Sequence, residues 1–134
     1  MNKTFRGLEY TTWENPATGS LCGYVKLPAK HPFIELLKKK TYYKLFSGKK
    51  MVIYGYDKLP IECHGGLTFG TNVRKPYHDF TKGWWIGWDY AHLGDCCPKL
   101  PLRMGEKERL WSEEEVIAEC KAVIKQVLDA LNVC

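Results

Sequence analysis

The segment from Ser112 to Leu131, SEEEVIAECKAVIKQVLDAL, decides the fold class of this chain. Ser112 stands three residues before Glu115, which is the spacing of a capping box, and glutamates in the first turn suit the positive end of a helix dipole. Apolar residues then recur at helical spacing, while polar residues occupy the opposite face. The sequence therefore predicts one amphipathic helix over residues 113–131 that packs against a sheet. Its predicted buried face consists of Val116, Cys120, Val123, Ile124, Val127, Leu128 and Leu131.

The chain upstream of this helix consists mainly of short β-branched and aromatic runs separated by glycine and proline. Strands that come first and a helix that comes last indicate an α+β fold, in which a small antiparallel or mixed β-sheet carries the C-terminal amphipathic helix on one face. Turn signals at residues 15–19 and 47–50 predict two hairpins. The predicted strands are residues 8–14, 21–27, 42–46, 51–56, 61–69 and 83–90, and a short helix is predicted over 33–40.

The 134 residues have the length of a single domain, residues 1–134. Their 45% hydrophobic and 26% charged composition excludes an intrinsically disordered chain. No apolar run is long enough to span a bilayer and the first residues lack a secretory signal, so we expect a cytoplasmic protein without a membrane partner. Residues 1–60 carry eleven Lys or Arg against four Asp or Glu. This basic half would attract phosphate-bearing partners, although solubility alone explains it equally well.

Six cysteines make an even count, but without a secretory context they do not indicate a disulfide framework. We therefore expect reduced thiols. By number, Cys63 and His64 together with Cys96 and Cys97 could supply zinc ligands. However, adjacent ligands at both ends lack the loop spacing of structural zinc sites. The sequence predicts neither a metal nor another cofactor.

A histidine followed by two glycines, in the segment ECHGGLT at residues 62–68, is the first candidate for chemistry. Gly65 and Gly66 permit a close backbone approach, and their N–H groups could face a phosphate or a carboxylate. The spacing of a P-loop is absent. A strand with a glycine bulge, in which His64 is a core residue, explains the same segment equally well.

A tryptophan-rich strand that ends in polar residues, GWWIGWDYAHLGD at residues 83–95, is the second candidate. Asp89, His92 and Asp95 lie just beyond this strand, where ligand-binding loops usually begin. They could ligate a metal, or an aspartate could position a proton-transfer histidine. Equally, both aspartates could cap backbone N–H groups while His92 hydrogen-bonds a carbonyl group. Because both candidate segments interrupt apolar strands, we expect them to meet in one site.

A basic patch with aromatic residues forms a third feature. Lysines attract phosphates and exposed aromatic rings provide faces on which bases stack. We favour a simpler interpretation, a solvated helix end followed by a strand whose aromatic residues belong to the core. The patch consists of Lys38, Lys39, Lys40, Lys44, Lys49 and Lys50 with Tyr42, Tyr43 and Phe46.

Several segments, in an order and spacing that span most of the chain, carry a resemblance. They are Cys22–Val25 followed by Pro28 and His31-Pro32, residues 64–68, residues 84–95, and Glu119-Cys120. In these segments the chain resembles a family of small, largely uncharacterised proteins encoded by phages, prophages and some bacteria. Members usually have Phe at the position of Trp88 and often Cys at that of Tyr90. The resemblance implies no established activity, but phage origin implies counter-defence in the host cytoplasm.

The leading hypothesis is a phage-type counter-defence protein that binds and sequesters a small phosphate-bearing ligand, such as a nucleotide signal. In it the phosphate contacts are Gly65, Gly66 and Thr68, the stacking residue is Trp84 or Trp88, and His92 hydrogen-bonds the ligand beside His64, Asp89 and Asp95.

Two alternatives stay open. A small hydrolase or phosphodiesterase would use His64 or His92 as general base or acid, oriented by Asp89 or Asp95. A protein-binding inhibitor of a host defence complex, similar to an anti-CRISPR protein, would use the basic face. The sequence decides neither whether the chain is an enzyme nor whether it forms a homo-oligomer.

Overall fold

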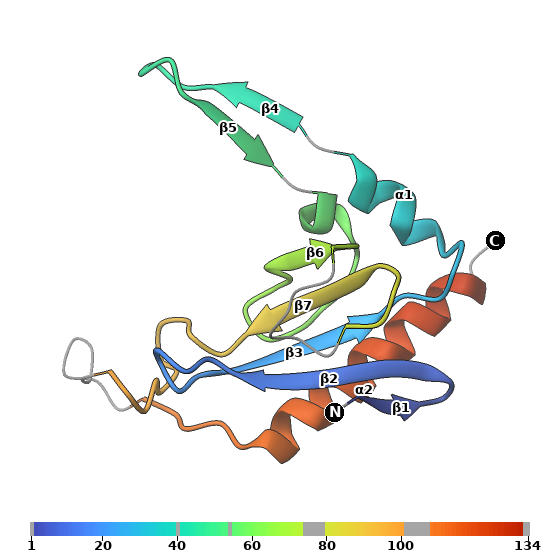
Figure 1. The fold of residues 1–134 in the computed structure, drawn as a ribbon, viewed down its shortest axis with the longest axis vertical. Coiled ribbons are helices and arrows are strands. Elements are labelled where there is room, and N and C mark those ends of the chain that lie inside the picture. Colours follow the sequence, from blue (N-terminus) through green and yellow to red (C-terminus); the bar gives the residue numbers. More distant parts are fainter. Residues whose placement is uncertain (1, 40, 54, 74–79, 101–107, 133–134) are drawn as a thin grey trace.

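A computed structural model describes residues 2–39, 41–53, 55–73, 80–100 and 108–132. The fold is α+β, with a five-stranded antiparallel sheet in the order β1-β2-β3-β7-β6 and a separate two-stranded ribbon, β4-β5 (Figure 1). The elements are β1 (Lys3–Phe5), β2 (Leu8–Glu14), β3 (Leu21–Lys26), α1 (Pro32–Lys38), β4 (Thr41–Lys44), β5 (Lys50–Ile53), η1 (Gly55–Lys58), β6 (Phe69–Thr71), β7 (Trp85–Asp89), α2 (Glu113–Asp129) and η2 (Ala130–Asn132).

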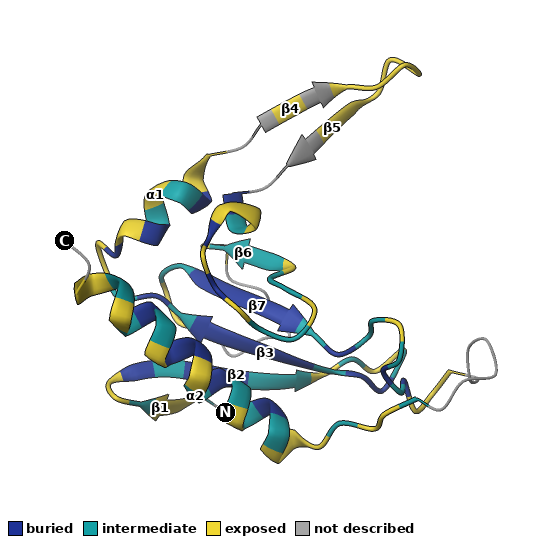
Figure 2. Ribbon diagram, turned by 180° about the vertical axis from the view of Figure 1, so that it is seen from behind, coloured by how far each residue is buried: buried dark blue, intermediate teal, exposed yellow. Residues whose placement is uncertain are grey.

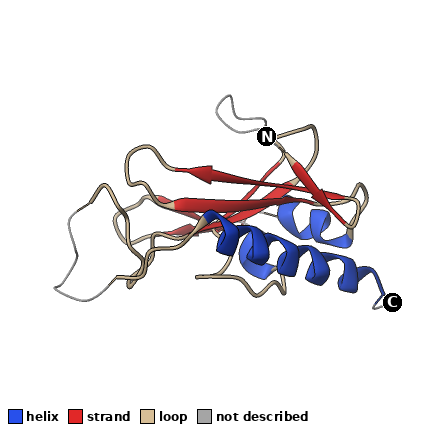
Figure 3. Ribbon diagram, turned by 90° about the horizontal axis from the view of Figure 1, so that it is seen from below, coloured by secondary structure: helices blue, strands red, loops and turns tan. Residues whose placement is uncertain are grey.

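The predicted C-terminal helix and its capping box are confirmed. Ser112 Oγ accepts a hydrogen bond from the backbone N–H of Glu115, and the Glu115 carboxylate accepts one from the backbone N–H of Ser112. The helix packs on one face of the sheet, above all on β2 and β3 (Figure 3). The α-helix ends at Asp129, and Leu131, predicted to be buried, lies exposed in the 3₁₀ turn that follows. The fully buried side chains of α2 are Val116, Cys120, Val123, Ile124 and Val127.

The sheet packs large aromatic rings against glycine on both faces. On the helix face, a Cβ on Gly23 would lie 2.6 Å from the ring of Trp88. On the opposite face, a Cβ on Gly87 would lie 2.3 Å from the ring of Tyr24. Each glycine therefore makes room for an aromatic ring on the neighbouring strand, because any larger residue would displace it. The face opposite α2 carries a second, smaller apolar cluster that includes Phe80 and Trp85.

His31 joins the two α-helices. Its Nδ1 accepts the backbone N–H of Phe33 at 3.1 Å and so caps α1. Because Nδ1 is the acceptor, Nε2 carries the hydrogen that is donated to the backbone oxygen of Val127, 2.8 Å away. His31 is almost completely buried. This histidine is therefore part of the core, and both ring nitrogens are used by the fold.

One predicted strand is wrong. Of residues 61–69 only Phe69 is in a strand, the three-residue β6, and the rest is irregular. Gly65 and Gly66 both have positive φ, 69° and 79°, which no strand accommodates. The short β1 at the sheet edge was not predicted. None of the helices in the described part of the chain combines the length and the apolarity that crossing a bilayer requires.

The second predicted hairpin forms, but Tyr42 and Phe46 do not join the core. β4 and β5 pair with each other and project away from the five-stranded sheet, beyond α1 and η1 (Figures 1 and 2). Tyr42 is 62% exposed and Phe46, in the connecting turn, is fully exposed. The expectation that the aromatic residues of this segment are buried is therefore wrong for both of these rings.

Candidate functional site

The structure brings the two candidate segments together, as predicted. His64 Nε2 lies 2.7 Å from Asp95 Oδ2, and Thr68 Oγ1 donates to Asp89 Oδ2 at 3.1 Å. The rings of His64 and His92 are 5.8 Å apart between centroids. We call this group the histidine–aspartate cluster. It consists of His64, Gly65, Gly66, Thr68, Asp89, His92 and Asp95.

Asp95 is the buried centre of this cluster, with 3% of its surface exposed. Its Oδ2 accepts hydrogen bonds from the His64 ring and from the backbone N–H of His92, and its Oδ1 accepts one from Trp111 Nε1 at 2.8 Å. Burial raises the pKa of this carboxyl, but the three donors outweigh burial and hold the pKa below its usual value. Asp95 therefore stays ionised and ties three separate chain segments together.

Asp89 has a comparable role nearer the surface. Its Oδ1 accepts the backbone N–H of Ala91 at 3.1 Å and its Oδ2 accepts the hydroxyl of Thr68. Nε2 of His92 lies 3.3 Å from Oδ1 of Asp89, without hydrogen-bond geometry to any described group. The capping role expected for both aspartates is confirmed. The carbonyl hydrogen bond expected for His92 is not formed with any described residue.

The two glycines after His64 serve this packing. A Cβ on Gly65 would lie 2.2 Å from Nε2 of His92, so the imidazole rests directly on the backbone of residue 65. Gly66 donates its N–H to the backbone oxygen of Cys63, which closes a turn with both glycines at positive φ. The glycines thus have a structural use, and none of the described contacts assigns them to a phosphate.

His64 is held between aromatic rings. It stacks on Tyr90 at 4.6 Å and packs against Trp111 at 4.7 Å, and about a quarter of its side chain is exposed. The guanidinium of Arg109 lies 3.7 Å above the Trp111 ring and pairs with Glu115. A carboxylate that orients an imidazole is the arrangement used for proton transfer. Here the carboxylate of Asp95 also accepts hydrogen bonds from two other donors. The arrangement therefore fits equally well a structural role, in which Asp95 holds chain segments together.

Trp111 and Arg109 were not among the site residues predicted from the sequence. A signal existed for Trp111, because it directly precedes the N-cap Ser112, the place of the first residue of a hydrophobic staple. Nothing local linked its indole N–H to Asp95, which lies sixteen residues upstream.

The two tryptophans of the predicted site lie elsewhere. Trp88 is 1% exposed beneath α2 and donates its Nε1–H to the hydroxyl of Tyr90 at 3.2 Å. It has no free face for a ligand, so its predicted stacking role is corrected to a core role. Trp84 precedes β7, at the end of the strand away from Asp89, and lines a separate cavity.

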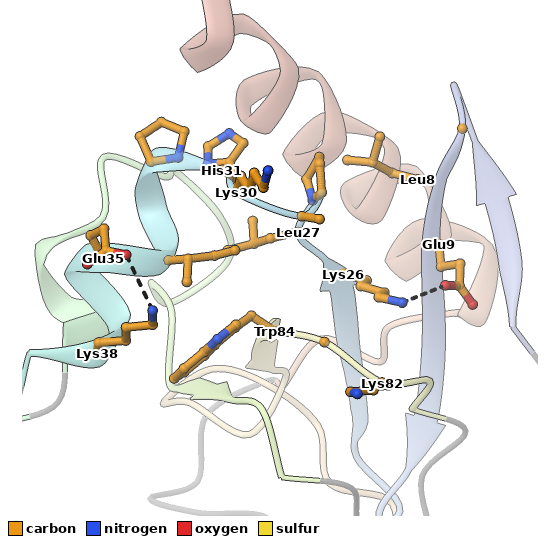
Figure 4. A pocket seen from close by; sticks show the side chains of 16 residues that line it. Leu8, Glu9, Lys26, Leu27, Lys30, His31, Glu35, Lys38, Lys82 and Trp84 are labelled. Carbon is orange, nitrogen blue, oxygen red and sulfur yellow. Dashed lines mark hydrogen bonds and ion pairs between the residues drawn. The ribbon is translucent and has the colours of Figure 1, made fainter.

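This cavity has a volume of about 700 Å³ and lies between α1, the end of β3 and the segment before β7 (Figure 4). Its apolar wall includes Leu27, Ile34 and Trp84. Four lysines and two glutamates supply the charges around it. They are Lys26, Lys30, Lys38 and Lys82 with Glu9 and Glu35. We call it the lysine cavity.

Only part of its positive charge is neutralised. Lys26 lies 3.3 Å from Glu9 and Lys38 lies 3.4 Å from Glu35, the latter pair being largely exposed (Figure 4). Lys30 and Lys82 form no ion pair within the described ranges. Burial raises the pKa of Glu9, but hydrogen bonds from Thr81, Asn2 and Lys26 lower it by more. The pKa therefore lies below its usual value and this carboxylate remains charged.

Lys26 is held in place at the cavity edge. Its Nζ donates to Glu9 and, at 2.9 Å, to the hydroxyl of Thr81. A Cβ on Gly83 would lie 2.7 Å from Cε of Lys26, so the glycine leaves the path of the lysine stem open. Lys30, which also lines the cavity, has a left-handed backbone with φ 65°, which is uncommon for a residue other than glycine.

Three of the thiols are poorly suited to nucleophilic chemistry. None of Cys22, Cys63, Cys96, Cys97 and Cys120 is in a disulfide bond. Burial is the largest influence on the pKa of Cys22, which it raises to about 11, and on those of Cys63 and Cys120, which it raises to about 12. A thiol with such a pKa is a poor nucleophile at neutral pH. Among the described residues no group of three or more His, Cys, Asp or Glu side chains is arranged to hold a metal ion. Cys134 lies outside them.

Comparison with known proteins found no matching family model, no curated relative and no similar solved structure.

Proposed function

We propose that this protein binds a small phosphate-bearing ligand, and that the lysine cavity is its site. The observation that carries the proposal is the unbalanced charge around an apolar wall: four lysines face two glutamates, and Lys30 and Lys82 have no carboxylate partner in the described chain. Lysine is a point-charge donor suited to phosphate oxygens.

The cavity also suits the rest of a nucleotide. Its volume of about 700 Å³ falls within the usual range of small-molecule pockets, about 300–1,000 Å³. Trp84 is half-buried, and stacking of a base on an aromatic ring contributes about 1–3 kcal/mol. Capture without cleavage fits a site whose charged groups are lysines and ion-paired glutamates, because none of its lining residues is an oriented general base. Its one histidine, His31, is buried and hydrogen-bonded through both ring nitrogens.

The histidine–aspartate cluster supports this function less well. Asp89 and Asp95 already accept donors from within the fold, so a ligand phosphate would face two carboxylates. Like charges at this range repel. The predicted role of Trp84 in stacking is therefore retained, and the phosphate contacts move to Lys30 and Lys82. Use of such capture against a host defence remains a prediction from the family resemblance.

Isothermal titration with ATP, and with inorganic triphosphate as a base-free probe, tests the proposal. The double variant Lys30→Glu/Lys82→Glu should lower the affinity for both probes at least tenfold. Lys125→Glu, an equal charge change per site on the exposed face of α2, should not. Trp84→Leu keeps apolar bulk and should weaken ATP binding while leaving triphosphate binding unchanged.

Two results would overturn this assignment. One is the absence of measurable binding to ATP and triphosphate at millimolar concentration, with the fold verified by circular dichroism. The other is a loss of binding free energy in Lys125→Glu that is at least half of the loss in the cavity variant, because Lys125→Glu changes the net charge half as much and the effect would then reduce to net charge. Mass analysis of the nucleotide recovered after denaturation distinguishes the enzyme alternative, because a hydrolase would release a cleaved product.

A further inference from the structure

The β4–β5 ribbon is an exposed structure that the rest of the fold does not use. It forms its own two-stranded sheet and extends away from the main sheet (Figures 1 and 2). An isolated two-stranded hairpin is marginally stable in water unless something packs on it. Four of its apolar side chains, Tyr42, Leu45, Phe46 and Met51, are exposed, with Phe46 at the tip. Apolar groups gathered in this way usually mark an interaction surface.

The charge of the ribbon identifies the kind of partner. Residues 36–56 contain six lysines and no aspartate or glutamate. Lys44 and Lys50 stand directly opposite each other in the β4–β5 register. Like charges at facing positions destabilise a sheet, so this pair weakens the free ribbon. A polyanion between or beside the two side chains would turn that repulsion into attraction.

The distribution of the lysines along the ribbon favours a nucleic acid. Lys38 and Lys39 lie at its base, whereas Lys44 and Lys50, the last pair before the turn, and Lys49 in the turn lie at its far end. A flat anionic surface would contact the far end alone, whereas a groove lined by two phosphate rows can contact the lysines at both ends of the ribbon. The major groove of B-form DNA, about 12 Å wide, admits a two-stranded ribbon, and that of A-form RNA is too narrow.

We propose that the β4–β5 ribbon is a DNA-binding arm that enters the major groove of double-stranded DNA. Lys44, Lys49 and Lys50 contact backbone phosphates, and Phe46 at the tip makes apolar contact with base edges. The phosphate contacts supply affinity with little dependence on sequence. Lys44, Lys49, Lys50 and Phe46 lie outside the lining of the lysine cavity, and the function of the arm does not rest on that of the cavity.

Fluorescence anisotropy with a labelled 20-base-pair DNA duplex, measured over a range of salt concentrations, tests the arm. Each phosphate contact contributes about 0.9 to the slope of log K against log salt. The triple variant Lys44→Gln/Lys49→Gln/Lys50→Gln should therefore reduce the slope by about three units. Phe46→Ala should weaken binding at every salt concentration without changing the slope. Because the substituted side chains of the ribbon are exposed, these changes should leave the fold intact, and circular dichroism can verify this.

Matched controls separate this arm from other sources of affinity. Lys121→Gln/Lys125→Gln on α2 and Lys30→Glu/Lys82→Glu in the cavity should retain the wild-type slope. Several outcomes would overturn the proposal: tighter binding to single-stranded than to duplex DNA, a slope unchanged by the triple variant, and binding to phosphatidylglycerol vesicles without binding to DNA. Self-association that requires Phe46 and is unaffected by DNA would likewise assign the ribbon to a second copy of the chain.

Discussion

Asp95→Asn should destabilise the protein more than any other change of one atom in the histidine–aspartate cluster. The two carboxylate oxygens of Asp95 accept from three donors: His64 and the His92 backbone N–H on Oδ2, and Trp111 on Oδ1. An asparagine keeps the shape but replaces one oxygen by an NH₂ group. In either orientation of the amide, at least one N–H donor then faces another donor.

The expected loss can be worked from these contacts. A buried donor left without an acceptor costs about 1–3 kcal/mol, and hydrogen bonds to a charged group are stronger than those to a neutral one. The loss of one hydrogen bond to residue 95, together with the loss of charge assistance in the other two, should cost about 2–4 kcal/mol of stability. The gain from removing a buried charge reduces this sum, because Asp95 is only 3% exposed. We therefore expect about 2–3 kcal/mol in the free energy of unfolding.

Urea denaturation followed by far-ultraviolet circular dichroism measures this loss. Asp129→Asn is the matched control, because Asp129 is exposed at the end of α2 and its change should stay within about 0.5 kcal/mol. A loss in Asp95→Asn no larger than in Asp129→Asn would refute the argument that this carboxylate joins three segments.

The pH dependence gives an independent check. Since the pKa of Asp95 is lower in the folded protein than in the unfolded chain, its stabilisation is complete above the unfolded value of about 3.9. It is lost as the pH falls through the lower, folded pKa. The difference in stability between wild type and Asp95→Asn should therefore be constant near neutrality and shrink below about pH 4. A difference that grows on acidification would contradict the direction of the pKa shift.

Three further predictions concern the core, the glycines and the thiols. Ile124→Ala should cost about 2–5 kcal/mol through lost burial and cavity formation, and an effect in chemical denaturation no greater than that of Lys125→Ala would contradict it. Gly65→Ala and Gly66→Ala both pay about 1–2 kcal/mol for a positive φ, but only Gly65→Ala also collides with an imidazole, so its melting temperature should be clearly lower; equal values would argue against that contact. Alkylation of the unfolded protein without reductant, read by mass spectrometry, should modify six cysteines, and two or more protected thiols would indicate a disulfide.

The parts of the fold that local sequence determines were predictable. The capping box and the helical period place α2 within two residues of its observed end. The turn signals place both hairpins, since glycine and asparagine in the turns specify them locally. The strand expected at residues 61–69 does not form over most of that range. Apolar residues of the segment are buried, but they belong to an irregular loop. There, Gly65 and Gly66 adopt conformations that no strand contains.

The site was predictable only where the sequence departs from the pattern expected of a buried strand. Glycine after His64, and aspartates at the end of an apolar strand, indicated that the two segments would meet, and they do. The third segment, which contributes Trp111, has the ordinary sequence of a helix start, so the sequence did not indicate that it belongs to the site. Similarly, an aromatic strand has the same sequence pattern whether its rings face a core or solvent. The exposure of Tyr42 and Phe46 therefore follows from the tertiary arrangement alone.

The arrangement of satisfied and unsatisfied charge explains why the proposed functions lie away from the histidine–aspartate cluster. A polar group that already has its partner in the fold gains little from a ligand, because binding must first break the existing bond. Asp89 and Asp95 are in that state. The basic excess of residues 1–60 instead lies in the lysines of the cavity and the ribbon, where acidic partners are few. Bringing a polyanion to those lysines releases the repulsion among them and breaks no bond within the core. We therefore expect a polyanion to bind favourably at the lysines of the cavity and the ribbon, most of which belong to residues 1–60.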